Sequence, residues 1–313
     1  MPELFANPIT ATTRYCAVYG HPVKHSASPA MQNAGLAALG LNWRYLAFEV
    51  HPEQLRDAIA GAKAMKFVGL NLTVPHKLLA LEMVDVLDES AEIWGAVNTI
   101  RFEARDDDGN WHPLDHYPGE IPGEIRSHGY NTDADAITRS LRDDLKLEVD
   151  GAKILVLGAG GAGRTAALKL AAEGAGALFL VNRTHRKAVE LAEEIRLRYP
   201  KVTAVAAYPG NLTVDLLLNA TSLGLKSSDA LPLDENHFPL SRAKAVYDMI
   251  YRPAETPLLL AAKQAGCRVA NGLGMLLHQG AKSLEIWSGR TPPIAAMRAA
   301  LEKNIYGGER AHV

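Results

Sequence analysis

Polar side chains with catalytic potential lie at the ends of predicted strands in the first half of the sequence. Ser26 and Ser28 stand before a predicted helix, where two hydroxyls and helix N–H groups can bind a small carboxylate. Lys77 falls in the first turn of another helix, where its charge opposes the helix dipole and therefore favours an anionic partner. Asn98 and Asp133 stand in the segments GAVNT and GYNTD. Since ligands bind at the carboxyl ends of strands in open α/β sheets, these residues are candidates for one site.

Each of these residues also has a purely structural interpretation. Ser28 can simply cap the helix that Pro29 opens, and Lys77 can be a solvated surface lysine. Asp133 can be an ordinary acidic residue at the start of a helix. The residue pattern alone leaves these alternatives open.

A glycine-rich loop follows the predicted strand 153–157 and precedes a predicted helix over 162–173. Its sequence GAGGAG fits the pattern G-x-G-x-x-G, in which the first glycine allows a tight turn, the second lets the backbone approach a pyrophosphate, and the third lets helix and strand pack closely. The helix N-terminus then offers N–H groups to the phosphates. The loop residues predicted to bind a dinucleotide are Gly158, Ala159, Gly160, Gly161, Ala162 and Gly163.

The end of the next predicted strand, 177–181, indicates which dinucleotide binds. An acidic residue about 20 residues after the loop would bind the ribose 2′-hydroxyl of NAD, but the segment is basic here. A 2′-phosphate would meet cationic and hydroxyl donors, which favours NADP; a solvated basic start of helix 185–198 is the alternative. The residues predicted to bind the 2′-phosphate are Asn182, Arg183, Thr184, Arg186 and Lys187.

The composition argues against several classes of partner and location. The 313 residues carry 33 Lys and Arg against 35 Asp and Glu, so binding to nucleic acid or a membrane surface has no electrostatic support. Cys16 and Cys267 are far apart and have no neighbouring histidine cluster, so we expect neither a disulfide nor a metal site. Because we find neither an apolar run of about 18 residues nor a signal-peptide pattern, we expect a cytoplasmic protein.

Short apolar runs alternate with helical patterns along the chain, which is typical of βαβ units in a parallel sheet. The predicted helices include 52–63 and 77–87. Residues 104–127, rich in Asp, Gly and Pro, interrupt the alternation and indicate a passive surface insertion, with a lid or an oligomer contact as alternatives. We therefore predict an α/β protein with an open α/β substrate-binding domain (residues 1–133 plus 272–313) and a Rossmann-type NADP-binding domain (residues 134–271).

Taken together, the motifs resemble those of the shikimate dehydrogenase family, in the family's order and along nearly the whole chain. They are GHPVKHSASPAMQN, NLTVPHK, GAVNT, GYNTD, GAGGAG, NRT, NATSLG, YDMIYRPAETPLL and NGLGMLLHQGA. The resemblance implies reduction of 3-dehydroshikimate to shikimate with NADPH, in the pathway to chorismate and the aromatic amino acids. It also implies an active site in the cleft between the two domains, and no metal, because a lysine acts on the carbonyl oxygen.

The resemblance implies a role for each matching residue. Lys77 and Asp133 match the catalytic pair, and Ser26 and Ser28 match the hydroxyls that hold the substrate carboxylate. The other substrate-binding positions are Thr73, Asn98 and Gln279 at the ring hydroxyls and Tyr251 near the carboxylate. The other cofactor-binding positions are Asn219, Thr221 and Ser222 beside the cofactor, and Met249 and Gly272 beside the nicotinamide.

Two alternative functions fit parts of this pattern. A quinate or quinate/shikimate dehydrogenase that uses NAD is disfavoured by Ser26, Ser28 and Thr73 and by the basic residues 182–187. A catalytically silent NADPH-binding sensor is disfavoured by the presence of Lys77 and Asp133. The expected partner is a small molecule, and we expect a monomer or a homodimer. The sequence departs from the family in the length of residues 104–127 and in Leu225, where the family often has Met.

Overall fold

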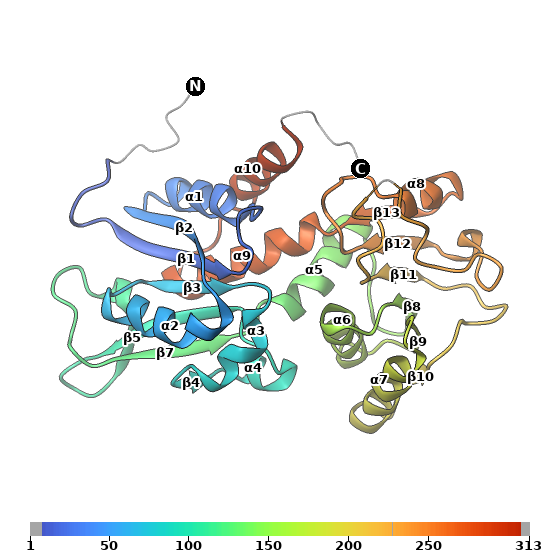
Figure 1. Cartoon of the computed structure of the whole chain (residues 1–313), viewed down its shortest axis with the longest axis horizontal. Helices are drawn as coiled ribbons and strands as arrows, with labels where there is room; N and C mark the ends of the chain where they lie inside the picture. The colour runs from blue at the N-terminus through green and yellow to red at the C-terminus, as the bar shows by residue number, and fades with distance from the viewer. Residues whose placement is uncertain (1–7, 227, 308–313) are drawn as a thin grey trace. The chain divides into compact units, whose positions relative to one another are not determined.

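The computed structural model describes residues 8–226 and 228–307, and these residues form two compact units (Figure 1). Unit 1 comprises the described residues up to Asp133 and from Gln279 onward, and unit 2 comprises residues 134–278. The chain re-enters unit 1 inside helix α9 (Leu273–Ser288), whereas the sequence pattern placed this return at residue 272.

Within the described residues, unit 1 contains a seven-stranded sheet in the order β2-β1-β3-β5-β7-β4, with β6 paired to β5. Its strands are β1 (Arg14–Gly20), β2 (Trp43–Glu49), β3 (Gly69–Leu72), β4 (Val86–Leu87), β5 (Thr99–Arg105), β6 (Trp111–Pro113) and β7 (Ile125–Tyr130). β1 is parallel to β2 and β3, but β5 is antiparallel to β3, β6 and β7. The prediction of a parallel sheet is therefore wrong for β5. A parallel pair needs a crossover, usually helical, and the segment between β5 and β7 instead folds back on β5.

Residues 104–127 belong partly to the core of unit 1, so their interpretation as a passive surface insertion is wrong. Strand β6 extends the sheet, and Leu114 is fully buried in the main apolar cluster of the unit. The Arg14 guanidinium donates hydrogen bonds to the backbone carbonyls of Leu114 and Tyr117. The abundance of Asp, Gly and Pro concealed these few apolar anchors in the sequence.

A buried carboxylate joins the strands of this region. Glu103 on β5 is 2% exposed and accepts hydrogen bonds from Arg101, Arg126 and His128. Burial alone would raise the pKa of Glu103, but these three donors lower it to about 2. The Arg126 guanidinium also lies 4.3 Å from the ring centroid of Trp111 on β6. Charge pairing and cation–π contact therefore fix β6 and β7 against β5.

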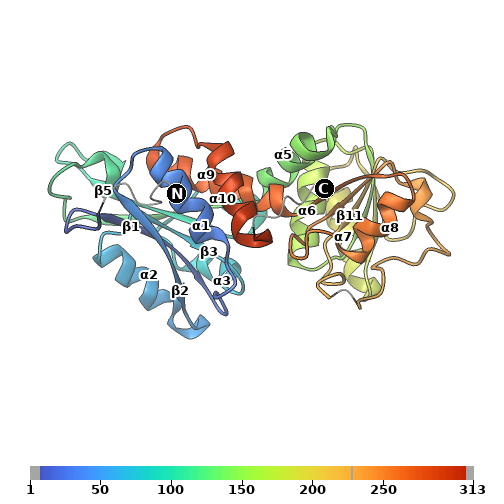
Figure 2. The ribbon, with the colours of Figure 1, turned by 90° about the horizontal axis from the view of Figure 1, so that it is seen from above.

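Helices cover both faces of the sheet of unit 1. Figure 2 shows α1 and α10 with α9 on one face, and α2 and α3 on the other. The helices are α1 (Ser28–Ala38), α2 (Leu55–Ala64), α3 (His76–Leu79), α4 (Glu89–Trp94) and α10 (Ile294–Tyr306), with 3-10 turns at Pro52–Gln54, Ala80–Glu82 and Leu114–His116. The predicted helix over 77–87 is wrong after residue 79, because residues 86 and 87 pair with β7 as strand β4.

The described residues of unit 2 form a six-stranded parallel sheet in the order β10-β9-β8-β11-β12-β13. Numbered from its first strand this order is 3-2-1-4-5-6, so the predicted Rossmann-type fold is confirmed. The strands are β8 (Lys153–Leu157), β9 (Ala177–Val181), β10 (Thr203–Val205), β11 (Leu216–Asn219), β12 (Ala245–Asp248) and β13 (Arg268–Asn271). The helices are α5 (Asp133–Leu145), α6 (Gly161–Ala172), α7 (His185–Arg198) and α8 (Pro257–Gln264), with a 3-10 turn at Leu240–Arg242.

Close packing between α9 and β3 requires a glycine in the strand. A Cβ at Gly69 would lie 2.1 Å from Trp287 Nε1 and 2.5 Å from the Ile100 carbonyl oxygen. We expect Gly69→Ala to lower the thermal midpoint of unfolding through an overpacking cost of about 1–3 kcal/mol. A matched control is Gly61→Ala in α2, where the nearest atom to the new Cβ, Met65 Cε, is 4.0 Å away. Helix propensity predicts an unchanged or higher midpoint for this control; a Gly69→Ala midpoint equal to that of the wild type would contradict the packing argument.

Candidate functional site

Strand directions gather the predicted substrate-binding segments at one edge of the sheet of unit 1. β5 lies between β3 and β7 and is antiparallel to both, so β3 and β7 run in the same direction. The ends of β3 and β7 and the start of β5 therefore share an edge. Lys77 and Asp133 follow β3 and β7, and Asn98 directly precedes β5. β1 is parallel to β3, so its end, which leads to Ser26, lies at the same edge.

Lys77 and Asp133 form an ion pair at this edge, with 2.6 Å between Lys77 Nζ and Asp133 Oδ2. The Lys77 carbonyl accepts a hydrogen bond of 2.9 Å from the Val97 N–H, and the Asp133 N–H donates to Asn131 Oδ1 at 3.1 Å. The two side chains are 31% and 13% exposed, so a ligand can reach them while the protein restricts their positions. An ammonium held in this way can give a proton to a ligand oxygen and recover one through the carboxylate.

Ser26 and Ser28 lie at the start of α1, but the prediction that Ser28 caps this helix is wrong. Ala27 is the N-cap residue and Ser28 is the first helical residue. The Ser28 N–H donates to Ser26 Oγ at 3.3 Å, and the N-cap residue Ala27 has no side chain that could accept a capping hydrogen bond. Thr73, the third hydroxyl residue predicted here, is half-buried after β3 and donates its N–H to the Tyr19 carbonyl at 3.0 Å.

The side-chain amide of Asn98 is held in a fixed orientation. Asn98 is 1% exposed; its Oδ1 accepts from the Thr132 N–H at 2.8 Å, and its Nδ2 donates to Thr132 Oγ1 at 2.9 Å. Sequence reasoning missed Thr132, although its position beside Asp133 in GYNTD was a signal. Gln279 belongs to unit 1 and is half-buried on α9.

The glycine loop joins β8 to α6 in a conformation that requires glycine. Gly158 has φ +103, and a Cβ at Gly163 would lie 2.0 Å from the Gly158 carbonyl oxygen. A Cβ at Gly160 or Gly161, by contrast, would meet no described atom within 4 Å. Gly158 and Gly163 therefore shape the loop, whereas Gly160 and Gly161 leave space at the N-terminus of α6. Such a cradle fits the close approach of a pyrophosphate.

Asn182 ties the end of β9 to the glycine loop. Its Oδ1 accepts from the Ala159 N–H at 2.9 Å, and its Nδ2 donates to the Thr184 carbonyl at 2.9 Å. Thr184 is the N-cap residue of α7. The same amide therefore connects the loop predicted to bind the pyrophosphate with the segment predicted to bind the 2′-phosphate.

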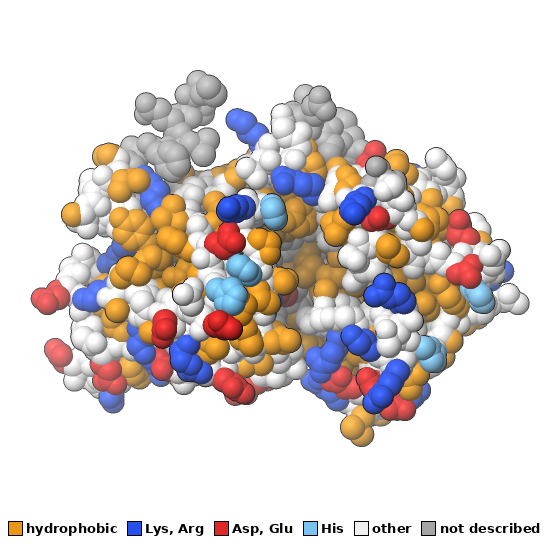
Figure 3. All heavy atoms as spheres, in the orientation of Figure 1, with side chains coloured by type: hydrophobic (Ala, Val, Ile, Leu, Met, Phe, Trp, Pro, Cys, Tyr) orange, Lys and Arg blue, Asp and Glu red, His pale blue; other side chains and the backbone are white. Residues whose placement is uncertain are grey.

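The cations predicted to bind the 2′-phosphate are exposed at the start of α7. Figure 3 shows Lys and Arg side chains gathered on unit 2 over the region of α6 and α7. Arg186 makes an ion pair of 2.7 Å with Glu190, whereas Arg183 and Lys187 have no ion pair within the described part of the chain. Two exposed positive charges at a helix N-terminus are unfavourable on their own, so this surface suits an anionic ligand.

Asn219 shapes the loop after β11 and is fully buried. Its Oδ1 accepts from the N–H and the hydroxyl of Thr221 at 3.0 and 2.8 Å. Its Nδ2 donates to the Leu223 carbonyl at 3.2 Å and to Asp248 Oδ1 at 3.0 Å. These bonds hold the loop that carries Thr221 and the exposed Ser222, which is the structural basis for any cofactor contact there.

Asp248 is a buried carboxylate that sequence reasoning missed. It is fully buried at the end of β12 and accepts hydrogen bonds from the Thr256 hydroxyl at 2.6 Å and the Ile250 N–H at 3.1 Å. Burial raises the pKa of Asp248 despite these donors. An acidic residue that ends an apolar strand was the available signal, because such a side chain must find buried donors.

Met249, Tyr251 and Gly272 follow the ends of two neighbouring strands of unit 2. Met249 comes directly after β12 and Gly272 directly after β13, and these strands are parallel. A Cβ at Gly272 would lie 2.0 Å from the Met249 carbonyl oxygen, so only glycine allows this approach. Tyr251 is half-buried, and burial raises the pKa of its phenol.

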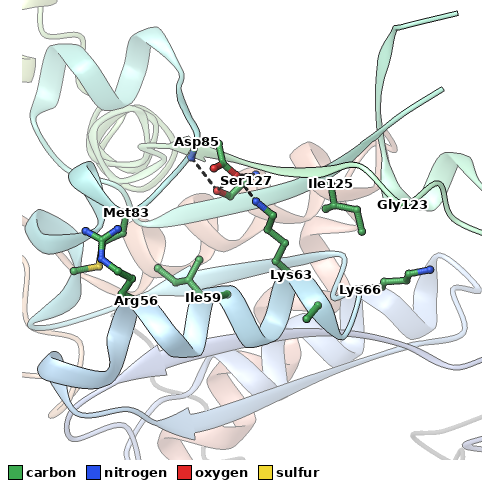
Figure 4. A pocket seen from close by; sticks show the side chains of 11 residues that line it. Arg56, Ile59, Lys63, Lys66, Met83, Asp85, Gly123, Ile125 and Ser127 are labelled. Atoms are coloured by element: carbon green, nitrogen blue, oxygen red, sulfur yellow. Dashed lines mark hydrogen bonds and ion pairs between the residues drawn. The ribbon is translucent and has the colours of Figure 1, made fainter. Parts of the chain in front are cut away.

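A groove on unit 1, shown in Figure 4, is lined by residues of α2 and of the segments before β4 and along β7. Lys63 Nζ lies 2.8 Å from Asp85 Oδ2, which also accepts from the N–H and hydroxyl of Ser127. Arg56 and Lys66 each donate to a backbone carbonyl. The described lining includes none of the predicted site residues, so this groove is separate from the candidate site.

Three further features of the structure concern metal ligands, membrane-spanning helices and the two cysteines. In residues 8–226 and 228–307, no group of three or more His, Cys, Asp and Glu side chains could hold a metal ion. The same part of the chain has no helix long and apolar enough to cross a membrane. Cys16 and Cys267 are buried free thiols.

Three family descriptions match successive parts of the chain. Residues 18–100 match the shikimate dehydrogenase substrate binding domain, and residues 141–223 match the shikimate / quinate 5-dehydrogenase family. Residues 272–302 match the shikimate 5'-dehydrogenase C-terminal domain. These matches span both units, and they cover the segments that carry most of the candidate site.

Individual relatives are similar along nearly their whole length. The shikimate dehydrogenase (NADP(+)) of Methanopyrus kandleri is 39% identical over 307 residues, which cover 95% of this chain and 98% of the relative. A crystal structure of a shikimate dehydrogenase in complex with NADP+ has a TM-score of 0.80 at 34% identity, covering 96% of this chain and 99% of that one. The Thermus thermophilus enzyme in complex with NADP(H) and shikimate has a TM-score of 0.76 at 35% identity, covering 93% and 99%.

Two glycine variants can distinguish the glycine that the loop conformation needs from the glycine that NADPH binding needs. Gly160 has φ −79 and ψ −171 and open space around its Cβ position, so we expect Gly160→Ala to keep the thermal midpoint of the ligand-free protein. The added methyl occupies the approach of the pyrophosphate, so the dissociation constant for NADPH should rise about tenfold or more. Gly163→Ala, which clashes with the Gly158 carbonyl, should lower the midpoint itself. Thermal unfolding and NADPH fluorescence titration measure the two effects; tight NADPH binding by Gly160→Ala would refute the assignment.

Proposed function

Because the chain belongs to the shikimate dehydrogenase family, we propose that Lys77 and Asp133 catalyse its reaction, the NADPH-dependent reduction of 3-dehydroshikimate to shikimate. The observation that carries this proposal is the ion pair of 2.6 Å between these two side chains. It stands at the strand edge where the segments of Ser26 and Asn98 also meet. An enzyme that reduces a ketone needs such a proton donor at the carbonyl oxygen.

Separate sets of side chains bind the carboxylate and the ring hydroxyls of the substrate. Ser26 and Ser28 bind the carboxylate through their hydroxyls at the start of α1, where the helix N-terminus favours an anion. Thr73, Asn98 and Gln279 bind the ring hydroxyls. Tyr251 contributes a phenol hydroxyl near the carboxylate.

Proton transfer and charge stabilisation are the work of Lys77. Bound NADPH supplies the hydride that reduces the carbonyl carbon of the substrate. The Lys77 ammonium stabilises the negative charge that develops on the carbonyl oxygen and donates the proton that completes the new hydroxyl. Asp133 orients the ammonium through the ion pair and takes part in returning a proton to it. In the oxidation of shikimate the same pair accepts the proton from the hydroxyl.

The cofactor half of the protein fits a phosphorylated dinucleotide. Residues 158–163 hold the pyrophosphate in the cradle that Gly160 and Gly161 leave open. Residues 182–187 receive the 2′-phosphate, with Arg183 and Lys187 as its charge partners. Thr221, Ser222, Met249 and Gly272 border the remaining cofactor, and Asn219 holds the loop of Thr221 and Ser222 in shape. The enzyme acts in the cytoplasm, as a monomer or a homodimer.

Removal of the Lys77 ammonium tests the catalytic proposal. We expect Lys77→Ala to lower kcat by about 10²–10⁴-fold, because acid–base help of this kind contributes that much. The NADPH dissociation constant should stay nearly unchanged, since Lys77 is not among the residues proposed to bind the cofactor. Loss of NADPH absorbance with 3-dehydroshikimate measures the rate.

Lys63→Ala is the matched control for this variant, because it breaks a comparable lysine–aspartate pair of 2.8 Å in the same unit. We expect wild-type kcat from it. A Lys77→Ala protein that turns over at the wild-type rate would refute the role of Lys77, and a wild-type protein that does not consume NADPH with 3-dehydroshikimate would refute the proposed function.

Replacement of Arg183 tests the 2′-phosphate assignment. Arg183→Ala should raise KM for NADPH about tenfold or more and leave KM for NADH nearly unchanged, because a charge-assisted hydrogen bond is worth about 1.5–3 kcal/mol and only NADPH carries the phosphate. Arg198→Ala is the control, since Arg198 lies at the other end of α7, the helix that follows Arg183, and pairs with Glu194. Equal changes for both cofactors would count against the contact.

A further inference from the structure

Ser283 joins three elements of unit 1 through one buried hydroxyl. It lies on α9 one turn after Gln279 and is fully buried. Its Oγ donates to the Gln279 carbonyl at 3.0 Å, accepts from Asn71 Nδ2 at 2.9 Å, and lies 2.8 Å from Thr99 Oγ1. The hydroxyl therefore connects α9 with β3, which contains Asn71, and with β5, which begins at Thr99.

The donors and acceptors of this cluster can be assigned. The Gln279 carbonyl can only accept, so Ser283 donates to it, and the hydroxyls of Thr99 and Ser283 lie 2.8 Å apart. Asn71 Oδ1 accepts from the Tyr45 hydroxyl at 2.7 Å, which directs Nδ2 toward Ser283 and toward Thr99 Oγ1 at 3.0 Å. Rotation of the Asn71 amide would break both contacts. A satisfied buried network of this kind permits one arrangement of its backbone segments.

Each partner of Ser283 belongs to, or lies within two residues of, a residue that the proposed function places at the ring hydroxyls of the substrate. Asn71 stands two residues before Thr73, Thr99 follows Asn98, and the third partner is the backbone of Gln279. Thr73 directly follows β3, Asn98 directly precedes β5, and Gln279 lies on α9, so nothing in the local chain fixes their mutual distances.

We propose that Ser283 is a positioning residue: its hydroxyl holds the backbone segments of Thr73, Asn98 and Gln279 in the relative positions that ring-hydroxyl recognition needs. Ser283 itself touches no substrate. This inference rests on the proposed function, because it assumes that these three residues bind the substrate ring. Affinity for an oriented substrate depends on sub-ångström placement of the groups that bind it, so loss of the Ser283 hydroxyl should weaken substrate binding.

The test compares Ser283→Ala with Ser288→Ala. Ser288 lies on the same helix, is also buried and donates to the carbonyl four residues before it at 2.7 Å, but it has no bond to β3 or β5 among the described contacts. We expect Ser283→Ala to raise KM for shikimate about tenfold, with KM for NADP unchanged. Ser288→Ala should leave both constants at the wild-type values even where its thermal midpoint falls.

A second pair of variants keeps the test decisive if Ser283→Ala does not fold. Thr99→Val preserves the shape and strand preference of Thr99 but removes its hydroxyl, whereas Thr99→Ser keeps the hydroxyl. KM for shikimate should be higher than that of the wild type in Thr99→Val and close to that of the wild type in Thr99→Ser.

The inference is overturned if KM for shikimate is unchanged in Ser283→Ala or in Thr99→Val. It is also overturned if KM for shikimate rises equally in Ser288→Ala. In each of these cases an active wild-type protein preserves the proposed function. A wild-type protein without activity on shikimate overturns both.

Discussion

In unit 1, β5 lies between β3 and β7 and runs against both, and the candidate site depends on this arrangement. It makes β3 and β7 parallel to each other, so Lys77 and Asp133 emerge at one edge and meet as an ion pair. It also turns the start of β5 toward that edge and thereby brings Asn98 to the same place. A parallel β5 would have carried Asn98 to the opposite edge.

Buried polar groups maintain this arrangement. The Glu103 carboxylate pairs with Arg101, Arg126 and His128 along β5 and β7, and the hydroxyl of Ser283 binds β3, β5 and α9 together. A buried polar group that loses its partner costs about 1–3 kcal/mol, and a buried charge costs more. A shift in register between these strands therefore costs more free energy than it would if only apolar contacts joined them, because apolar contacts tolerate small displacements.

In unit 2 the candidate cofactor-binding surface depends mainly on the course of the backbone. Gly160 leaves open space at the N-terminus of α6, because it has no Cβ. Gly272 can approach the Met249 carbonyl closely for the same reason. Side chains such as Asn182 and Asn219 serve mainly to hold the loops around this space. Charge is added at the surface by Arg183 and Lys187 without burial, so the unit avoids the desolvation cost that a buried cation would carry.

The sequence by itself determined the features that depend on neighbours in the chain. The glycine loop, the Rossmann-type order of the second unit and the polar residues at the strand ends follow from local patterns of glycine, charge and apolar spacing. The tertiary structure alone decided the direction of β5, the core position of Leu114, and the contacts of Thr132, Asp248 and Ser283. The physical reason is that strand direction and buried hydrogen bonds are chosen by partners far away in the chain, whose identity no local pattern records.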